Sequence, residues 1–439
     1  MYSLLIRNAR IAHPDGSVSD GDLVCEGSVI ARIDTTLSVP AYAVLDANGL
    51  LLLPGVIDPQ VHFREPGAPQ KEDLATGSRA AVSGGVTSFL EMPNTHPPTI
   101  SQAALDDKLA RAARKSVANY GFFIGATPDN LDELNRVSPT CGIKVFMGAS
   151  TGDLLVDRPE DLERIFATGS RLIAVHAERE ARIQARRGLL AERSDAAVHS
   201  EIRDNQCAFE ATQLALDLSI KYKRRLHILH MSTHEEVELL RRHKPAWVTA
   251  EVVPNHLFLN VNDYATQGTL VQMNPPLRQP EDNSALWQGL HEGVIDFVAT
   301  DHAPHTLEEK RRPYPQSPSG TPGVETSLPL MLTQMIAGQC TLAEIQHWMC
   351  YGPAEAYRIP RKGKLLEGWD ADMTLVDLET HRPVRDQALF TKVGWSPFRG
   401  WELQGWPVYT IVSGHIAFDH GQVREDVRGR PLQFAASEQ

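Results

Sequence analysis

Eight short apolar segments alternate with polar, mostly helix-like segments through the middle of the chain, and this alternation limits the fold more than any other feature. The segments are rich in β-branched and aromatic residues, which is typical of buried strands. They are GVIDPQVHF, VTSFLEMPN, ANYGFFIGAT, GIKVFMGAS, RLIAVHAE, RLHILHMS, WVTAEVVPNH and IDFVATDHAPH, in chain order from residue 55 to residue 305. Eight strands with intervening helices predict an α/β fold, a (β/α)8 barrel of the TIM type.

The two chain ends have a different pattern. Short strand-like segments separated by turn residues fill the first fifty residues, and similar segments such as ADMTLVDLE and VYTIVSGHIAFDHGQV occur near the end. We therefore predict one small β-sandwich domain built from both ends, with the barrel between them. The predicted domain boundaries are 1–53, 54–360 and 361–439.

The composition argues against several classes of function. The formal net charge is -12 and basic residues gather only in short groups such as KYKRR, so we expect no nucleic-acid partner. No apolar stretch reaches the ~20 residues that span a bilayer, so we expect no membrane partner. The first residues, MYSLLIRNAR, lack the layout of a signal peptide, and the five cysteines form no CxxC pair. These features favour a reduced, cytoplasmic protein.

Polar side chains that can bind metals or take part in catalysis gather at the ends of the predicted strands, where a barrel of this type has its active site. A single histidine there is more often a hydrogen-bonded structural residue than a metal ligand. Three histidines and an aspartate on strand ends that converge are instead typical of a site for zinc or a similar divalent metal. These residues are His62, His176, His230 and Asp301, and His305 follows close behind.

Lys144 lies inside the apolar segment GIKVFMG, which implies that its side chain is buried. A buried ammonium group without a partner is costly, so one explanation is a salt bridge. The other is that burial lowers the pKa of Lys144 and the neutral amine adds carbon dioxide. The resulting carbamate would be an anionic ligand that bridges two metals. The sequence leaves both explanations open.

Gln60 occupies a position where a metal-site signature, Asp-x-His-x-His, would have its first histidine; here the segment reads DPQVH. A glutamine carbonyl is a weaker donor to zinc than imidazole. We therefore predict one tightly bound Zn²⁺ and a second that is weak or missing, with Gln60 either ligating weakly or only forming a hydrogen bond.

Several motifs occur in an order that resembles dihydroorotases of the cyclic amidohydrolase superfamily. They are DPQVHFREPG, EMPNTHP, GIKVFMGASTGDLLVD, VHAE, LHILHMST, MNPPLR, ATDHAPHTLEEK, GWDADMTLVD and GWSPF. The resemblance covers nearly the whole chain. One bacterial subgroup shares both QVHFREPG and GIKVFMG, so Gln60 is similar to a feature of that subgroup.

The resemblance implies a role for each matching residue. It implies that His62 and Asp301 hold one zinc, that His176 and His230 hold the other, and that carboxylated Lys144 bridges them. The implied substrate-binding residues are Arg64, Asn94 and His305 at a carboxylate and Asn274 beside the pyrimidine ring. Asn255 stands where many relatives have a histidine, and its effect is open.

The activity implied is the reversible cyclisation of N-carbamoyl-L-aspartate, a small-molecule substrate, to (S)-dihydroorotate in pyrimidine biosynthesis. A metal lowers the pKa of bound water to about 7, and Asp301 would act as general acid and base beside that metal-bound hydroxide. Family members are commonly dimers or larger, so a homo-oligomer is expected.

Two alternatives stay open. One is a hydantoinase or allantoinase, which does not need the carboxylate-binding residues. The other is a catalytically silent homologue that serves as a structural partner of aspartate carbamoyltransferase. Gln60 favours the silent homologue, whereas the retained metal-binding residues argue against it.

Overall fold

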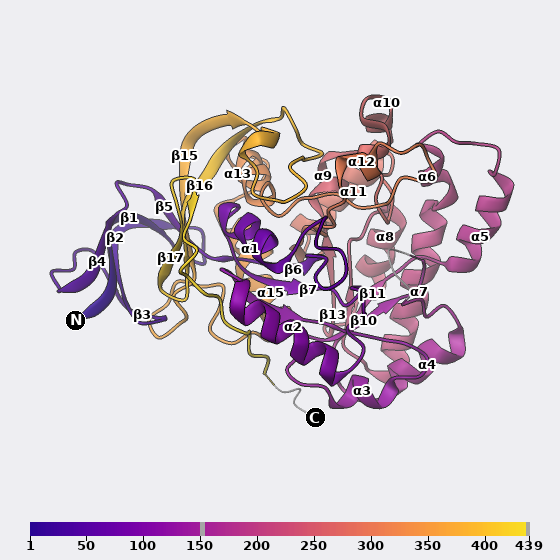
Figure 1. Ribbon diagram of the computed structural model, residues 1–439, viewed down its shortest axis with the longest axis horizontal. Coiled ribbons are helices and arrows are strands. Elements are labelled where there is room, and N and C mark those ends of the chain that lie inside the picture. Colours follow the sequence, from indigo (N-terminus) through magenta and orange to yellow (C-terminus); the bar gives the residue numbers. More distant parts are fainter. Residues whose placement is uncertain (150–153, 436–439) are drawn as a thin grey trace.

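A computed structural model describes residues 1–149 and 154–435 of the chain. Residues 150–153, which belong to the predicted motif GIKVFMGASTGDLLVD, and the last four residues of the predicted third segment lie outside the described residues. Figure 1 shows two parts: strands and surrounding helices on the right, and a β domain on the left that contains the N-terminus. The late strands β15, β16 and β17 lie beside the early strands in that domain, far from them in sequence.

The eight predicted barrel strands are confirmed, and all their hydrogen-bonded pairs are parallel. They form one sheet of order β6-β7-β8 and another of order β14-β13-β12-β11-β10-β9. The strands are β6 Val56–Val61, β7 Val86–Glu91, β8 Asn119–Phe122 with β9 Ile124–Gly125, β10 Ile143–Phe146, β11 Ile173–His176, β12 Leu226–Ile228, β13 Val248–Val252 and β14 Phe297–Val298. A parallel bridge between Val61 and His302 brings the first strand beside the segment after the last. This is an α/β architecture of the TIM-barrel type.

Helices connect these strands and cover the outside of the barrel, as the pattern predicts (Figure 1). The first begins at Asp73, whose carboxylate accepts hydrogen bonds from two backbone N–H groups of the first turn, a stabilising N-cap. The helices are α1 Leu74–Ser83, α2 Gln102–Lys115, α3 Leu131–Arg136, α4 Pro159–Ala167, α5 Glu180–Leu189, α6 Val198–Ile202, α7 Asn205–Tyr222, α8 His234–His243, α9 Pro254–Phe258, α10 Tyr264–Gln267, α11 Pro280–His291, α12 Leu307–Lys310, α13 Ser327–Ile336, α14 Leu342–Gln346 and α15 Gly352–Ala356.

Strands from both chain ends form the β domain, which confirms that part of the prediction. They pair in one sheet of order β18-β17-β16-β15-β5-β1-β2-β3, with β4 added beside β1. The strands are β1 Tyr2–Ala12, β2 Val18–Glu26, β3 Val29–Asp34, β4 Ala41–Asp46, β5 Leu51–Pro54, β15 Met373–Pro383, β16 Glu402–Val412, β17 His415–Asp419 and β18 Gln422–Val423. The two-layered sandwich stays a prediction. The boundaries at 53/54 and 360/361 stay our proposal, supported by β5 pairing with β1 and β15, whereas β6 pairs with β7.

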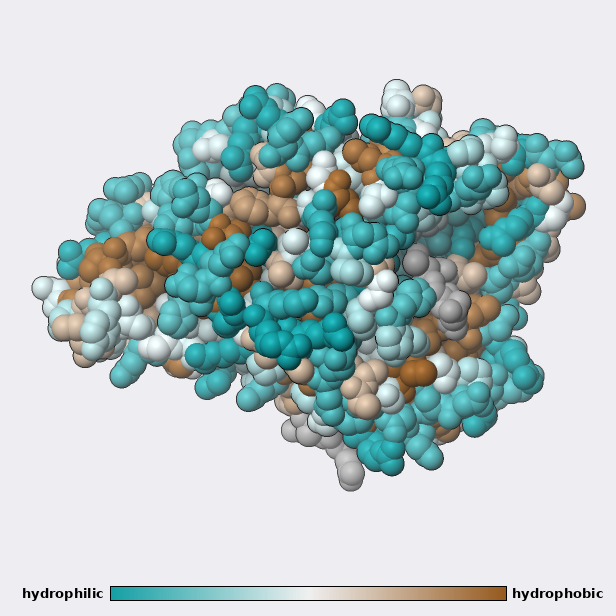
Figure 2. Space-filling view, viewed as in Figure 1, coloured by the Kyte–Doolittle hydropathy of each residue, from teal (hydrophilic) through white to brown (hydrophobic). Residues whose placement is uncertain are grey.

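The largest apolar core lies mainly in the barrel but includes β-domain residues such as Ala12, Leu51 and Phe418, and a second apolar cluster lies within the β domain. The face seen in Figure 2 is mostly hydrophilic, with hydrophobic residues gathered toward the β-domain end. Across the described residues, no helix is long and apolar enough to cross a bilayer.

Candidate active site

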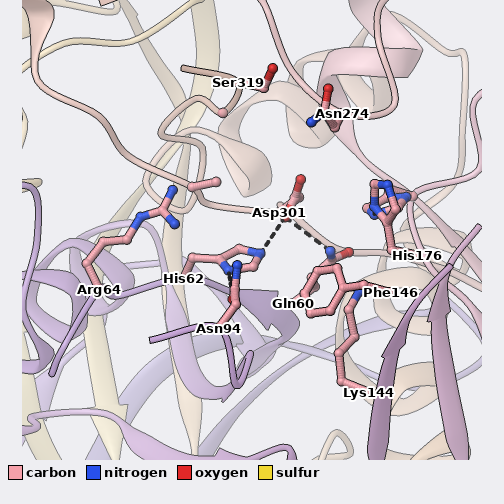
Figure 3. A pocket seen from close by; sticks show the side chains of 13 residues that line it. Gln60, His62, Arg64, Asn94, Lys144, Phe146, His176, Asn274, Asp301 and Ser319 are labelled. Atoms are coloured by element: carbon pink, nitrogen blue, oxygen red, sulfur yellow. Dashed lines mark hydrogen bonds and ion pairs between the residues drawn. The ribbon is translucent and has the colours of Figure 1, made fainter. Parts of the chain in front are cut away.

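A pocket of roughly 340 Å³, counting its open mouth, lies at the carboxyl ends of the barrel strands. Figure 3 shows Asp301 in the middle, Arg64 on one side and His176 on the other. The pocket brings together nearly all the residues that the sequence singled out. It is lined by Gln60, His62, Arg64, Asn94, Lys144, Phe146, His176, His230, Asn274, Asp301, Ala303, Ser319 and Gly320. His305 does not line the pocket but contacts Arg64, and Asn255 donates a hydrogen bond to Thr321 instead.

Three residues that line the pocket have a backbone in the left-handed region, which residues other than glycine rarely adopt. The φ angles are +61° at Arg64, +37° at His230 and +47° at Asp301. Such conformations cost of order 1–3 kcal/mol each and gather at functional sites, where the surrounding structure enforces them. The strained backbone therefore coincides with the predicted site.

His176 and His230 form the first side of the pocket, and both are almost fully buried. His176 Nε2 lies 2.9 Å from a carboxylate oxygen of Glu178, so this nitrogen carries the proton and Nδ1 has a free lone pair. Burial lowers the pKa of His176 and lowers that of His230 strongly, which keeps both rings neutral at pH 7. The lone pair on His176 Nδ1 points at His230 Nε2, 3.0 Å away.

An ion pair behind Glu178 holds this arrangement in place. Burial alone would raise the pKa of Glu178, but Arg203 and His176 lower it to about 2, so the carboxylate stays charged. Arg203 forms an ion pair with Glu178 and also donates to the Ala149 carbonyl. A histidine held by a carboxylate in this way is the usual arrangement around a metal ligand.

Gln60, His62 and Asp301 form the second side. His62 Nδ1 donates to the Asn94 amide oxygen over 2.8 Å, which leaves a lone pair on Nε2 in the neutral ring. That lone pair faces Asp301 Oδ1 at 3.0 Å, and burial lowers the pKa of His62. Two acceptors facing each other at this distance repel unless a proton or cation lies between them. Gln60 Nε2 donates to the same Asp301 oxygen over 3.1 Å.

Lys144 lies on β10, and its charge acts on both sides of the pocket. It lowers the pKa of His62, His176 and His230. Burial lowers the pKa of Lys144 itself to about 7. Within residues 1–149 and 154–435 its ammonium group has no ion pair, and it lies 4.5 Å from the centroid of the Phe146 ring. The salt bridge that would explain a buried lysine is therefore absent from the described residues.

The pocket presents two pairs of atoms that can bind a metal ion: one from His176 and His230, the other from His62 and Asp301. No group of three or more His, Cys, Asp or Glu side chains in the described residues is arranged to hold a metal ion. Each pair nonetheless presents two donor atoms about as far apart as two ligands of one tetrahedral zinc, roughly 3.3 Å for bonds of 2.0–2.1 Å. The buried Gln60 Oε1 and His230 Nδ1 lack hydrogen-bond partners in the described part of the chain. Buried atoms without partners and lone pairs that face each other are expected where side chains are arranged to bind cations.

Arg64 and His305 form a third group, and Lys71 sets its chemistry. Lys71 Nζ lies 2.9 Å from His305 Nδ1, so Nδ1 accepts a hydrogen bond from the ammonium group. His305 Nε2 lies 3.0 Å from the Ser319 carbonyl oxygen and must therefore carry the proton. Arg64 Nη2 lies 3.2 Å from this Nε2. Since both groups are donors and the His305 N–H already donates to Ser319, they do not bond each other, and Arg64, which lines the pocket, is the donor that an anion in the pocket can reach.

The sequence did not single out several residues that complete the pocket. Lys310 is fully buried and donates to the carbonyls of Gln272 and Pro318, which lie on the two loops that carry Asn274 and Ser319. Lys310 is the last residue of the quoted motif ATDHAPHTLEEK, whereas Lys71 lies beyond the end of DPQVHFREPG and outside every quoted motif. Glu178 ends the quoted motif VHAE but was given no role there, and His199 lies outside every quoted motif.

The fold and this pocket define an enzyme of the α/β-barrel class. The sequence profile of the Amidohydrolase family matches residues 51–417, and the chain belongs to the amidohydrolase family. It is 37% identical over 447 residues to a dihydroorotase of Methanosarcina mazei, covering 98% of this chain and 96% of that protein. It is 37% identical to a dihydroorotase of Halobacterium salinarum, covering 94% and 96%. Among solved structures, the L-hydantoinase (dihydropyrimidinase) of Arthrobacter aurescens superposes with a TM-score of 0.94 at 30% identity, covering 99% and 100%.

Proposed function

We propose that this protein is a dihydroorotase, which interconverts N-carbamoyl-L-aspartate and (S)-dihydroorotate in pyrimidine biosynthesis. The observation that carries the proposal is the Arg64 guanidinium in the pocket lining, with His305 beside it, because a neutral ring needs no such cation. The full-length similarity to dihydroorotases supports it.

The substrate carboxylate is held in this proposal by Arg64, and His305 lies beside the Arg64 guanidinium. Burial lowers the pKa of Arg64 to about 10, so the guanidinium stays charged at pH 7 and offers a planar fork to a carboxylate. Lys71 adds a second positive charge behind His305. Asn94 lines the same pocket, and its amide oxygen accepts a hydrogen bond from His62.

Zinc is held in this proposal by the two donor pairs. A catalytic zinc takes three protein ligands, so each pair is one ligand short. A carbamate on Lys144 would supply that ligand to both, and the absence of an ion pair at this buried lysine among the described residues supports it. Bound zinc polarises a carbonyl group and activates water at neutral pH. The subgroup assignment based on Gln60 is part of this proposal.

Asp301 is the general acid and base of the proposed reaction. Its carboxylate faces the middle of the pocket (Figure 3), within reach of water that attacks a ring carbonyl. In the hydrolytic direction a carbon–oxygen bond forms, the amide carbon–nitrogen bond breaks, and Asp301 passes the proton from the water to the leaving ring nitrogen. Gln60 orients the Asp301 carboxylate through its hydrogen bond to Oδ1.

A hydantoinase or dihydropyrimidinase is the second candidate, favoured by the L-hydantoinase structure that superposes on this chain. The deciding experiment compares dihydroorotate with dihydrouracil, which is the same ring without the carboxylate, in one zinc-loaded preparation. We expect turnover of dihydroorotate and little turnover of dihydrouracil. The opposite preference would favour the second candidate, and zinc binding without turnover of either would favour a silent homologue. The homo-oligomeric state and the cytoplasmic location stay predictions.

A further inference from the structure

We propose that His199 is a positioning residue: it turns the Asn274 amide so that its NH2 group faces the pocket, where it donates to a carbonyl oxygen of the substrate ring. The inference rests on the proposed function only for the identity of that ring. His199 lies on α6, outside the barrel strands, and is 6% exposed. It contacts the pocket only through other residues.

The position of the proton on the His199 ring is fixed by a neighbouring group that can only accept a hydrogen bond. His199 Nε2 lies 3.1 Å from the backbone carbonyl oxygen of Met273, and a carbonyl oxygen only accepts. Nε2 therefore carries the proton. On the other side of the ring, Nδ1 lies 3.5 Å from the Tyr314 hydroxyl, which can donate to it. Burial, followed by the nearby charge of Arg203, lowers the pKa of His199 to about 3, in agreement with a neutral ring that has a single N–H.

This N–H decides the orientation of the Asn274 amide. Asn274 Oδ1 lies 2.8 Å from His199 Nε2 and is the nearest of three oxygens around this N–H, the others being the Met273 carbonyl at 3.1 Å and the Ser319 hydroxyl at 3.4 Å. The reversed amide would set its NH2 group against the imidazole N–H, donor against donor. The oxygen is thus held outside the pocket. In the view of Figure 3 the Asn274 nitrogen is turned toward Asp301 and the oxygen away from it.

The orientation has a consequence for specificity. Asn274 lines the pocket, and its NH2 group makes no hydrogen bond within the described part of the chain. A donor at this place suits a carbonyl oxygen of a cyclic amide or ureide and disfavours a ring N–H. A site built to hydrogen-bond one group strongly rejects an analogue that lacks it, because its buried polar groups are then left unpaired.

The first test reads the tautomer without using activity. Nitrogen-15 spectra of labelled histidine side chains distinguish a ring protonated at Nε2 from one protonated at Nδ1, and the spectrum of His199→Gln assigns the signal by its loss. We expect His199 to be neutral and protonated at Nε2 from pH 5 to 8. A ring protonated at Nδ1 would overturn the proposal, whether or not the protein proves to be a dihydroorotase.

The second test separates positioning from packing. His199→Phe fills the space but has no N–H, whereas glutamine keeps a donor at the end of its side chain. We expect KM for dihydroorotate to rise about tenfold or more in His199→Phe, with kcat changed less, and to stay within about fivefold in His199→Gln. An equal loss in both variants would show a purely structural role. The exposed His381 is the control, and His381→Phe should leave KM unchanged.

Asn274→Asp provides a third readout that does not depend on folding of the His199 variants. It exchanges the NH2 group for an oxygen and leaves the bond from His199 in place, so KM should rise by about tenfold to a hundredfold. If dihydrouracil proves to be the substrate, the same pattern is expected with that ring, since it has the same carbonyl groups. An unchanged KM in Asn274→Asp would overturn the proposal.

Discussion

The two sides of the pocket contain similar atoms but differ in how they are supported. On the first side, His176 is fixed by Glu178, which is fixed in turn by Arg203, and its unprotonated nitrogen faces His230. On the second side, the position that would supply another imidazole holds Gln60, whose NH2 group donates to Asp301. The first side presents lone pairs, whereas the second already uses one carboxylate oxygen internally.

This difference means that the number of possible ligands on each side does not by itself predict how tightly that side binds a metal ion. A cation that enters the second side must compete with the hydrogen bond from Gln60 to Asp301. It could also gain the Gln60 carbonyl oxygen, which has no hydrogen-bond partner among the described residues. That oxygen is a weaker donor than imidazole. We therefore expect the two sides to bind a metal ion with unequal affinities.

Removing the carboxylate of the second side should have the largest effect. Asp301→Asn retains size and polarity but cannot shuttle a proton, so we expect kcat to fall about 10³-fold, within the usual contribution of general acid and base catalysis. The tight zinc should remain, because the donors of the first side are unchanged. Turnover and zinc content are measured in the same preparation. Loss of the tight zinc would mean that the two sides are not independent.

Removing the guanidinium that we propose binds the substrate carboxylate should have a smaller effect and should leave both sides of the pocket unchanged. In Arg64→Met we expect kcat/KM for dihydroorotate to fall about 10²-fold, because the substrate carboxylate loses a charged partner. Zinc content should stay the same. The control is Arg114→Met on the exposed face of α2, which should change neither quantity. An unchanged kcat/KM in Arg64→Met would refute the role of Arg64 and weaken the proposed function.

Replacing Gln60 with histidine should reduce the difference in zinc affinity between the two sides. We expect metal titration of the unmodified protein to find one tight zinc equivalent and a second that is weak or missing. Gln60→His should tighten the second by about tenfold or more and leave the first unchanged, because imidazole replaces an amide that donates to Asp301. Titration against a chelator of known affinity measures both.

Two outcomes of that titration would contradict the comparison. Two equally tight zinc ions in the unmodified protein would show that Gln60 does not weaken its side. Absence of any tight zinc would favour the silent homologue. A change in the first equivalent in Gln60→His would show that the two sides are coupled.

Much of this site could be predicted because barrel topology converts sequence order into spatial convergence. His62, His176, His230 and Asp301 each follow a predicted strand, and the strand ends meet at one pocket. The supporting residues could not be found in this way. Glu178 and His199 act through the tautomer of a ring or the orientation of an amide, and these depend on distances between segments that are remote in sequence. Gln60 was recognised, but its role as a donor to Asp301 required the structure.

The smallest expected effect concerns Lys144, which links the two sides. Its pKa is lowered to about 7, so the amine is mostly protonated below pH 7 and mostly neutral above it, and only the neutral amine adds carbon dioxide. Forming the carbamate from the amine and bicarbonate releases water and no net proton, so at a constant bicarbonate concentration the carbamate follows the neutral amine. In metal-free protein the carbamate at Lys144 should therefore increase by about tenfold between pH 6 and 8, with its midpoint near pH 7, and then level off. An ordinary lysine would still be rising steeply over this range. Carbon-13 spectra with labelled carbon dioxide measure the carbamate, and Lys144→Met should remove the signal. A signal that keeps rising tenfold per pH unit up to pH 9 would show that burial does not prepare Lys144, and a carbamate common to both sides would then have to form only together with the metals.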